Sequence, residues 1–176
     1  MKTIKASALT FVLALIFASS VFAMSERNLP DRKFGSTKGK YQDFYLMDLD
    51  GVYTRLSESK GKVVFLNFFA TWCPPCRNEM PSMQKLHDKM KGSDFEMIAV
   101  SVDRGGSDRV KDFIRKNGYT FKVLLDGDGS AAKKYSVSSI PATFIIDKEG
   151  NVVHRAIGER DWGNDPVVSE LKKLTK

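Results

Sequence analysis

The sequence has little cysteine: two residues in 176, Cys73 and Cys76, separated by two prolines. A disulfide stabilises a protein mainly by closing a loop in the unfolded chain, and the gain grows with loop length. The loop between these cysteines is nearly the shortest that a disulfide can close, which argues against a structural cross-link. Arg77, and not His, follows the second cysteine, which argues against covalent attachment of a c-type haem.

The chain also lacks an Arg-rich run, although its formal net charge is +7. Its lysines are spread along the sequence without aromatic residues interleaved among them. This pattern favours a solvated, mildly basic surface over nucleic-acid binding. Internal repeats and long low-complexity segments are absent too. The 153 residues that follow residue 23 have the ordinary size of one domain, so we expect a single domain.

The one long apolar stretch lies at the N-terminus, from about Leu9 to Ala18, after two lysines. Small residues before Met24 suit cleavage after Ala23, as in a secretory signal peptide. The stretch is shorter than the roughly 20 residues that a membrane-spanning helix needs, so an uncleaved anchor is the less favoured alternative. We therefore predict a signal peptide over 1–23, export to the periplasm or another extracytoplasmic compartment, a mobile lead-in over 24–40, and a domain over 41–176.

Strand and helix patterns alternate through the rest of the chain. An apolar alternation around Asp50-Gly51 predicts a β-hairpin, and a second hairpin is predicted around residues 148–151. Buried strands are predicted over 62–70 and 95–103, with a further strand over 121–126. Helices are predicted over 73–91, over 107–117 with Ser107 as N-cap, around 131–135, and over 166–174 with Asp165 as N-cap. The pattern indicates an α/β fold, with a central mixed sheet and helices on both faces.

The predicted helix over 73–91 places both cysteines in its first turn. Unpaired N–H groups and the helix dipole favour negative charge on the sulfur of Cys73 there. Cysteines of Cys-x-x-Cys motifs at helix starts commonly have pKa values below the usual value of about 8.5. Cys76 lies almost one turn later, so it can form a disulfide with Cys73. We expect Cys73 to face solvent as a nucleophile and Cys76 to face inward as a resolving thiol.

Two segments, "FLNFFATWCPPCRNEMP" and "SSIPATFIIDKEGNVV", resemble the thioredoxin superfamily, and more narrowly its TlpA/ResA-like exported thiol–disulfide oxidoreductases. The resemblance covers about Lys40 to Lys176. It implies a thioredoxin-like fold with an extra N-terminal β-hairpin. It also implies exchange of disulfides with protein substrates through the Cys-Pro-Pro-Cys site, with no cofactor and no metal. The expected protein is a monomer that receives electrons from a membrane thiol–disulfide transporter. Its expected direction is reduction, including that of apocytochromes during cytochrome c maturation.

The same resemblance implies a substrate-binding surface around the two cysteines. Pro141 should be a cis-proline beside the disulfide, and the backbone of Ile140 should pair with an extended substrate segment. Trp72 should shape the surface around Cys73. Pro74 and Pro75 should limit the freedom of the active-site loop and tune its reduction potential.

One departure from thioredoxin itself concerns the proton that leaves Cys76. Thioredoxins have a buried aspartate six residues before the first cysteine, where this chain has Asn67, which cannot titrate. Glu79 lies on the same helical face as Cys76 and matches a glutamate of ResA-like proteins. We predict that burial raises the pKa of Glu79 and that Glu79 accepts and donates the proton.

Two alternatives use the same fold. A copper-binding assembly factor would use the thiolates and a histidine as ligands for Cu(I). The only candidates are His87, which lies on the apolar stripe of a helix, and His154, which lies in the second hairpin. A peroxiredoxin would need Thr three residues before its nucleophile, where this chain has Ala70. Trp162 is interpreted as a packing residue.

Overall fold

A computed structural model describes residues 39–176. The signal peptide predicted over 1–23 and nearly all of the lead-in predicted over 24–40 therefore lie outside the described residues. The elements in chain order are β1 (Tyr45–Asp48), β2 (Tyr53–Arg55), η2 (Leu56–Ser59), β3 (Val63–Phe69), α2 (Pro74–Lys89), β4 (Phe95–Ser101), α3 (Ser107–Asn117), β5 (Lys122–Leu125), α4 (Ser130–Lys134), β6 (Ala142–Ile146), β7 (Val152–Ile157) and α5 (Asp165–Leu174).

The seven strands form one mixed sheet in the order β2-β1-β5-β4-β3-β6-β7. Strands β3, β4 and β5 are parallel, whereas β6 and β7 continue the sheet on one side as an antiparallel hairpin. On the other side, β1 pairs antiparallel with both β5 and β2. Both predicted hairpins are confirmed. Because β3 and β4 are parallel, the loops that follow them meet at one edge of the sheet.

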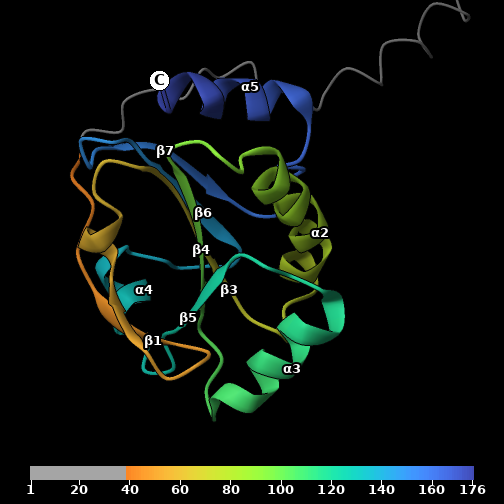
Figure 1. The fold of residues 1–176 in the computed structure, drawn as a ribbon. Coiled ribbons are helices and arrows are strands. Elements are labelled where there is room, and N and C mark those ends of the chain that lie inside the picture. The colour runs from red at the N-terminus through yellow and green to blue at the C-terminus, as the bar shows by residue number, and fades with distance from the viewer. Residues whose placement is uncertain (1–38) are drawn as a thin grey trace, which may run out of the picture. The chain divides into compact units, whose positions relative to one another are not determined.

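Helices cover both faces of the sheet, as Figure 1 shows with α2 and α3 on one side and α4 on the other. All seven residues of β3 are buried, and its side chains alternate between the two faces. Phe65 and Phe69 pack with residues of α2, α3 and α5 in one hydrophobic cluster. Leu66 and Phe68 belong to the second cluster, with residues of η2 and α4. The predicted thioredoxin-like architecture is confirmed.

Two predicted helix caps were wrong by one residue. Helix α3 has Gly106 as N-cap, with a φ of 111°, and Ser107 is its first helical residue. A positive φ favours glycine, and the chain enters this helix through Gly105-Gly106. Helix α5 is capped by Asn164, whose Oδ1 accepts the N–H of Val167 at 3.0 Å. Asparagine and aspartate cap helices about equally well, so the sequence alone does not show whether Asn164 or Asp165 is the N-cap of α5.

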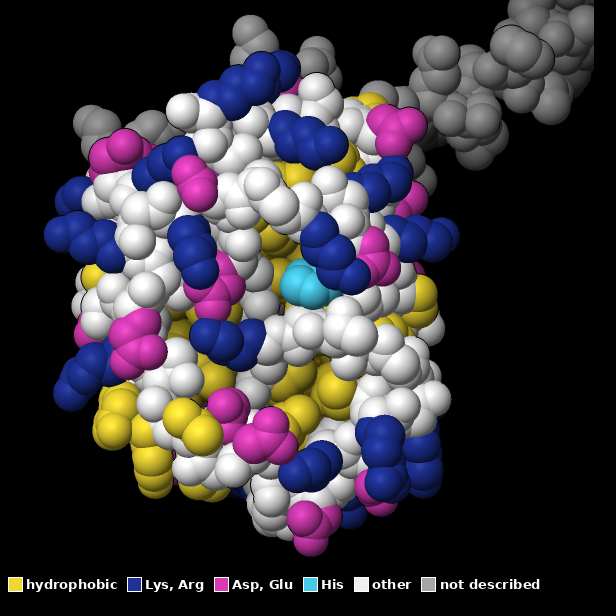
Figure 2. All heavy atoms as spheres, in the orientation of Figure 1, with side chains coloured by type: hydrophobic (Ala, Val, Ile, Leu, Met, Phe, Trp, Pro, Cys, Tyr) yellow, Lys and Arg dark blue, Asp and Glu magenta, His cyan; other side chains and the backbone are white. Residues whose placement is uncertain are grey.

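Charges of both signs are interspersed on the face of the molecule in Figure 2. An apolar area lies at its lower left, over the hairpin of β1 and β2, where Tyr45, Val52 and Tyr53 are exposed. Within residues 39–176, we find no helix with the length and apolar character needed to cross a membrane.

Candidate active site at the start of helix α2

Cys73 and Cys76 form a disulfide at the N-terminus of α2, with their Cα atoms 5.3 Å apart. Cys73 is the N-cap residue, and its Sγ accepts the backbone N–H of Cys76 at 3.3 Å. Pro74 and Pro75 occupy the first two helical positions, where a residue without an N–H leaves no donor unpaired. The local sequence therefore fixes the start of the helix at the nucleophile candidate.

The loop before Cys73 is held by the end of the neighbouring strand. Thr71 donates its backbone N–H to Asp103 Oδ2 at 2.9 Å and its hydroxyl to Oδ1 at 2.6 Å. Asp103 follows β4 and is itself buried. Its Oδ2 also accepts the hydroxyl of Ser101 at 2.7 Å. These bonds join the active-site loop to the sheet edge at which β3 and β4 end.

The two cysteines differ less in exposure than the sequence predicts. Cys76 is fully buried, as expected, but Cys73 is only 3% exposed and does not face solvent openly in the disulfide form. Trp72 beside it is 62% exposed, and Pro74 is exposed as well. The residues on either side of Cys73 are therefore exposed, whereas Cys73 itself is almost fully buried.

The segment before β6 covers one side of the disulfide. The Ile140–Pro141 peptide bond is cis, as the resemblance implies. The carbonyl oxygen of Ile140 lies 3.9 Å from Cys73 Sγ, which explains part of the low exposure of Cys73. Pro141 is buried, and its carbonyl accepts the N–H of Gly158 at 2.8 Å. The fold thus brings Ile140 and Pro141 to the cysteine pair.

Glu79 is a buried carboxyl group on α2, one turn beyond Cys76, and only 1% of it is exposed. Its Oε1 accepts a hydrogen bond from Asn67 Nδ2 at 2.8 Å. Its Oε2 accepts the indole N–H of Trp162 at 3.1 Å and the backbone N–H of Arg160 at 3.2 Å. Burial raises the pKa of Glu79 to about 7, against the opposing effect of these three donors. The predicted upward direction of the pKa is confirmed.

Sequence reasoning missed most of the residues around this carboxyl group. Trp162 packs edge-on against Phe65, as predicted for a core residue, but it also donates to Glu79. Thr143, on β6, accepts a hydrogen bond from Asn67 Nδ2 at 2.9 Å. A buried carboxyl group needs hydrogen-bond donors, so donors to Glu79 could be expected from the sequence. The sequence does not show which residues supply them, namely residues of β3 and of the segment after β7.

The segment after β7 is held closely against α2. Ser82 Oγ accepts the backbone N–H of Trp162 at 3.0 Å, and its hydroxyl lies 2.7 Å from the carbonyl oxygen of Glu79 and 3.2 Å from that of Arg160. A Cβ atom on Gly163 would lie 2.9 Å from Lys85 Cβ and 3.0 Å from the carbonyl oxygen of Ser82. Glycine at this position therefore permits the close approach that brings Trp162 to Glu79.

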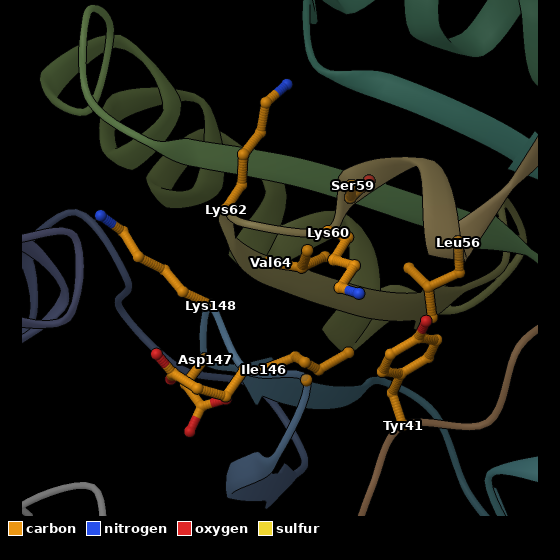
Figure 3. A pocket seen from close by; sticks show the side chains of 11 residues that line it. Tyr41, Leu56, Ser59, Lys60, Lys62, Val64, Ile146, Asp147 and Lys148 are labelled. Carbon is orange, nitrogen blue, oxygen red and sulfur yellow. The ribbon is translucent and has the colours of Figure 1, made fainter.

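A cavity of about 210 Å³ lies away from the disulfide, at the opposite end of β3. Figure 3 shows Lys60, Lys62 and Lys148 around an apolar floor that includes Val64 and Ile146. Lys62 pairs with Glu96, and Lys148 pairs with Asp94. This cavity contains none of the cysteine, glutamate or tryptophan side chains discussed above.

The histidines considered for copper lie outside the disulfide site. His87 is half-buried, with its ring edge-on to Phe121 at 6.3 Å, and burial lowers its pKa. His154 is on β7. Among residues 39–176, no group of three or more His, Cys, Asp and Glu side chains is arranged to hold a metal ion.

Comparison with known proteins adds three findings. Residues 38–155 match the model of the AhpC/TSA family. The chain is 35% identical over 165 residues to the thiol–disulfide oxidoreductase ResA of Bacillus thuringiensis, covering 93% of this chain and 94% of that one. The ResA of Bacillus subtilis is 40% identical over 116 residues, covering 66% of this chain and 64% of that one.

Solved structures agree with these sequence matches. A thiol:disulfide interchange protein of the thioredoxin family from Chlorobium tepidum superposes with a TM-score of 0.67 at 26% identity, covering 78% of this chain and 96% of that one. StoA from Bacillus subtilis superposes with a TM-score of 0.62 at 27% identity, covering 77% of this chain and 97% of that one.

Proposed function

The chain belongs to the AhpC/TSA family and is a ResA-type thiol–disulfide oxidoreductase, and from this we propose that Cys73, Cys76 and Glu79 carry its reaction. One observation supports the assignment most strongly. The disulfide lies at a helix N-terminus, 3.9 Å from the Ile140 carbonyl oxygen, and a buried carboxyl group, Glu79, follows Cys76 by about one turn of the same helix. Such an arrangement contains a nucleophile, a resolving thiol and a proton acceptor.

In the reductive direction, the thiolate of Cys73 attacks one sulfur of a substrate disulfide. This step forms a mixed disulfide and releases the other substrate sulfur as a thiolate. Cys76 then attacks Cys73 Sγ, which forms the Cys73–Cys76 disulfide and releases the second substrate sulfur. Two electrons pass from the cysteine pair to the substrate.

Glu79 takes the proton that Cys76 loses before its attack, and later returns it to a departing sulfur. A proton acceptor works best when its pKa lies near the working pH. The pKa of Glu79, raised to about 7 by burial, meets this condition. Glu79 is held in place by donors from two other parts of the chain, β3 and the segment after β7.

The substrate is a protein segment in extended form. Trp72 and Pro74 form the exposed surface beside Cys73, while Ile140 presents its backbone next to the same sulfur. An extended segment can hydrogen-bond to that backbone by strand addition. Pro75, half-buried in the first turn, restricts the loop that carries both cysteines.

The proposed setting is extracytoplasmic, with the signal peptide over 1–23 directing export. The monomeric protein works as a reductant without a bound cofactor, and its electrons come from a membrane thiol–disulfide transporter. Its proposed substrates include apocytochromes during cytochrome c maturation. The ResA name of the relatives and the N-terminal sequence support this setting.

Covalent trapping tests the proposal. In the Cys76→Ser variant the mixed disulfide on Cys73 cannot be resolved, so substrates should remain attached to the exported protein. Recovery of apocytochromes supports cytochrome c maturation, and recovery of a broad set of secreted proteins contradicts it in favour of general reduction. If Cys76→Ser captures no more protein than a Cys73→Ser control, the exchange role of Cys73 is overturned.

A further inference from the structure

The two oxygens of Glu79 have different kinds of partners. Oε2 faces two N–H groups, from Arg160 and Trp162, which can only donate. A proton on Oε2 would be directed at the hydrogens of these two N–H groups, which would be repulsive. Oε1 faces a single side chain, the carboxamide of Asn67. The acidic proton of Glu79 therefore belongs on Oε1, because only that oxygen faces a group that could become an acceptor.

Asn67 is fully buried on β3, and its carboxamide is oriented for the ionised form of Glu79. Nδ2 uses both hydrogens, one toward Glu79 Oε1 at 2.8 Å and one toward Thr143 Oγ1 at 2.9 Å. Its Oδ1 is buried without a hydrogen-bond partner. An unpartnered buried amide oxygen is unfavourable, so the charge on Glu79 and the acceptor on Thr143 together hold this orientation.

This orientation does not suit a protonated Glu79. A hydrogen on Oε1 would meet the hydrogens of Nδ2, and the contact would be repulsive. Half a turn of the carboxamide about its last side-chain bond exchanges oxygen and nitrogen within the same volume. Oδ1 would then accept from Glu79. The Thr143 hydroxyl, which can either accept or donate, would donate to the same oxygen.

We infer that Asn67 and Thr143 are positioning residues that switch with Glu79. When Oε1 takes the proton of Cys76, the Asn67 carboxamide turns over and the Thr143 hydroxyl changes from acceptor to donor. The proton leaves Cys76 Sγ and arrives on Oε1, and no other covalent bond changes. The inference rests on the proposed role of Glu79 as proton acceptor.

The surroundings suit a switch that depends on one charge. Helix α2 contributes the Cys73–Cys76 pair, and the segment after β7 contributes Glu159, whose charge raises the pKa of Glu79. The groups that hydrogen-bond in this network, the Asn67 amide, the Thr143 hydroxyl and the two N–H groups that Oε2 accepts, are neutral. When Glu79 is ionised, Oδ1 of Asn67 lacks a hydrogen-bond partner, and when Glu79 is protonated, Nδ2 lacks one. Each state therefore leaves one buried polar group unpaired, so neither protonation state of Glu79 is strongly favoured.

Nuclear magnetic resonance of the oxidised full chain tests the turn directly. We would titrate the carboxyl carbon of Glu79 and the side-chain amide nitrogen of Asn67 together. Both signals should move with one midpoint, and the close contacts of the amide hydrogens to Thr143 should be lost below it. An Asn67 amide that keeps its shifts and its Thr143 contacts through the Glu79 midpoint would overturn the inference.

A pair of substitutions at Thr143 provides the second test. In Thr143→Val the ionised state leaves one amide hydrogen unpaired, whereas the turned amide still accepts from Glu79. Each form loses its bond to the Thr143 hydroxyl, but the turned Oδ1 keeps one donor whereas the ionised form is left with an unpaired buried N–H. The ionised form is therefore destabilised more, and the Glu79 midpoint should rise by up to about one pH unit. Thr143→Ser keeps the hydroxyl and should restore the parent midpoint. Equal midpoints in the parent, Val and Ser proteins would contradict the switch.

The two proposals fail in different measurements. If the amide turns but Glu79→Gln exchanges disulfides at the parent rate, the switch stands and the catalytic role of Glu79 is wrong. If Glu79→Gln is slow but the amide does not turn, the catalytic role stands and the switch is wrong.

Discussion

Trp162 donates its indole N–H to Glu79 Oε2 over 3.1 Å, although 83 positions separate the two residues in the sequence. The indole ring also packs edge-on against Phe65, with ring centroids 5.0 Å apart. A single side chain thus belongs to the hydrophobic core and lowers the pKa of the buried carboxyl group. Substitution can separate these two roles.

Replacing Trp162 with Phe should keep the aromatic packing and remove the donor. The N–H of Trp162 lowers the pKa of Glu79, so its loss should raise that pKa further. The variant should lose about 1–3 kcal/mol of unfolding free energy above pH 7, where Glu79 is ionised. The loss should be smaller near pH 5. Urea unfolding at both pH values measures the difference.

Trp72→Phe is the control for this substitution, since Trp72 is 62% exposed. Its stability should match that of the parent at both pH values. An equal loss in Trp162→Phe at pH 5 and pH 8 would mean that the effect is packing alone.

The stability of the oxidised protein should fall as the pH rises from about 4.5 to about 7. Folding raises the pKa of Glu79 from 4.5 to about 7, so the folded state binds this proton more tightly than the unfolded state. The stabilisation is complete below the lower value and is lost through the higher one. The contribution of this group is about 3 kcal/mol.

Glu79→Gln should lack this pH dependence, so it should gain stability relative to the parent between pH 4 and pH 8. Other acids, such as Glu96 with its lowered pKa, act in the opposite sense but equally in both proteins. The difference between the two urea midpoints therefore isolates Glu79. Parallel pH curves for parent and variant would refute the raised pKa.

Disulfide exchange by Glu79→Gln should be slower by about a hundredfold, because a positioned proton acceptor is lost. The inflection near pH 7 in the parent rate profile should disappear as well. Stopped-flow reduction of a model disulfide between pH 5 and pH 9 provides the measurement. Glu159→Gln is the control, since this exposed neighbour only raises the pKa of Glu79. Its inflection should move to lower pH with the limiting rate unchanged.

Gly163→Ala should destabilise the protein by about 1–3 kcal/mol, because the added methyl group overlaps Lys85 Cβ and the backbone of Ser82. The overlap should push Trp162 away from Glu79 and raise the pKa of that carboxyl group. Gly127→Ala is a matched control, since its Cβ would lie at an ordinary 3.4 Å from the carbonyl oxygen of Asp103. Thermal unfolding of both variants distinguishes a steric effect from the general effect of removing glycine.

In the reduced protein at neutral pH, iodoacetamide should modify Cys73 before Cys76. The Cys73 sulfur accepts an N–H at the helix start, and Cys73 keeps a small exposed area next to the exposed Trp72 in the sequence, whereas Cys76 is fully buried. Peptide mass spectrometry after short exposure shows the order of modification. If Cys73 remains unmodified in the folded reduced protein, its role as nucleophile is wrong.

Much of the fold could be predicted because local patterns and burial agree. The continuous apolar run of β3, the apolar stripe of α2 and the glycine turns of both hairpins each specify one element. The cysteine pair and Glu79 could be found because they lie within one helix, at fixed spacing. Ile140 and Pro141 could be assigned to the site only through the resemblance to the TlpA/ResA-like proteins.

The environment of Glu79 could not be predicted, because it depends on how distant segments pack. Nothing near Trp162 in the sequence distinguishes a packing tryptophan from one that donates to a carboxylate. The low exposure of Cys73 likewise depends on the Ile140 segment, which approaches from another strand. The true helix caps, Gly106 and Asn164, were missed because the residues that follow them, Ser107 and Asp165, are also good N-cap types.

The late position of Trp162 has a consequence for how the protein matures. A growing chain presents Cys73 and Cys76 long before the ribosome adds the residues that cover and hydrogen-bond Glu79. Until the residues around Trp162 are synthesised and folded, Cys73 and Cys76 are a dithiol next to an acidic residue whose pKa is not yet raised by burial. Truncated products that end before Trp162 would thus contain both sulfurs and still lack a tuned proton acceptor.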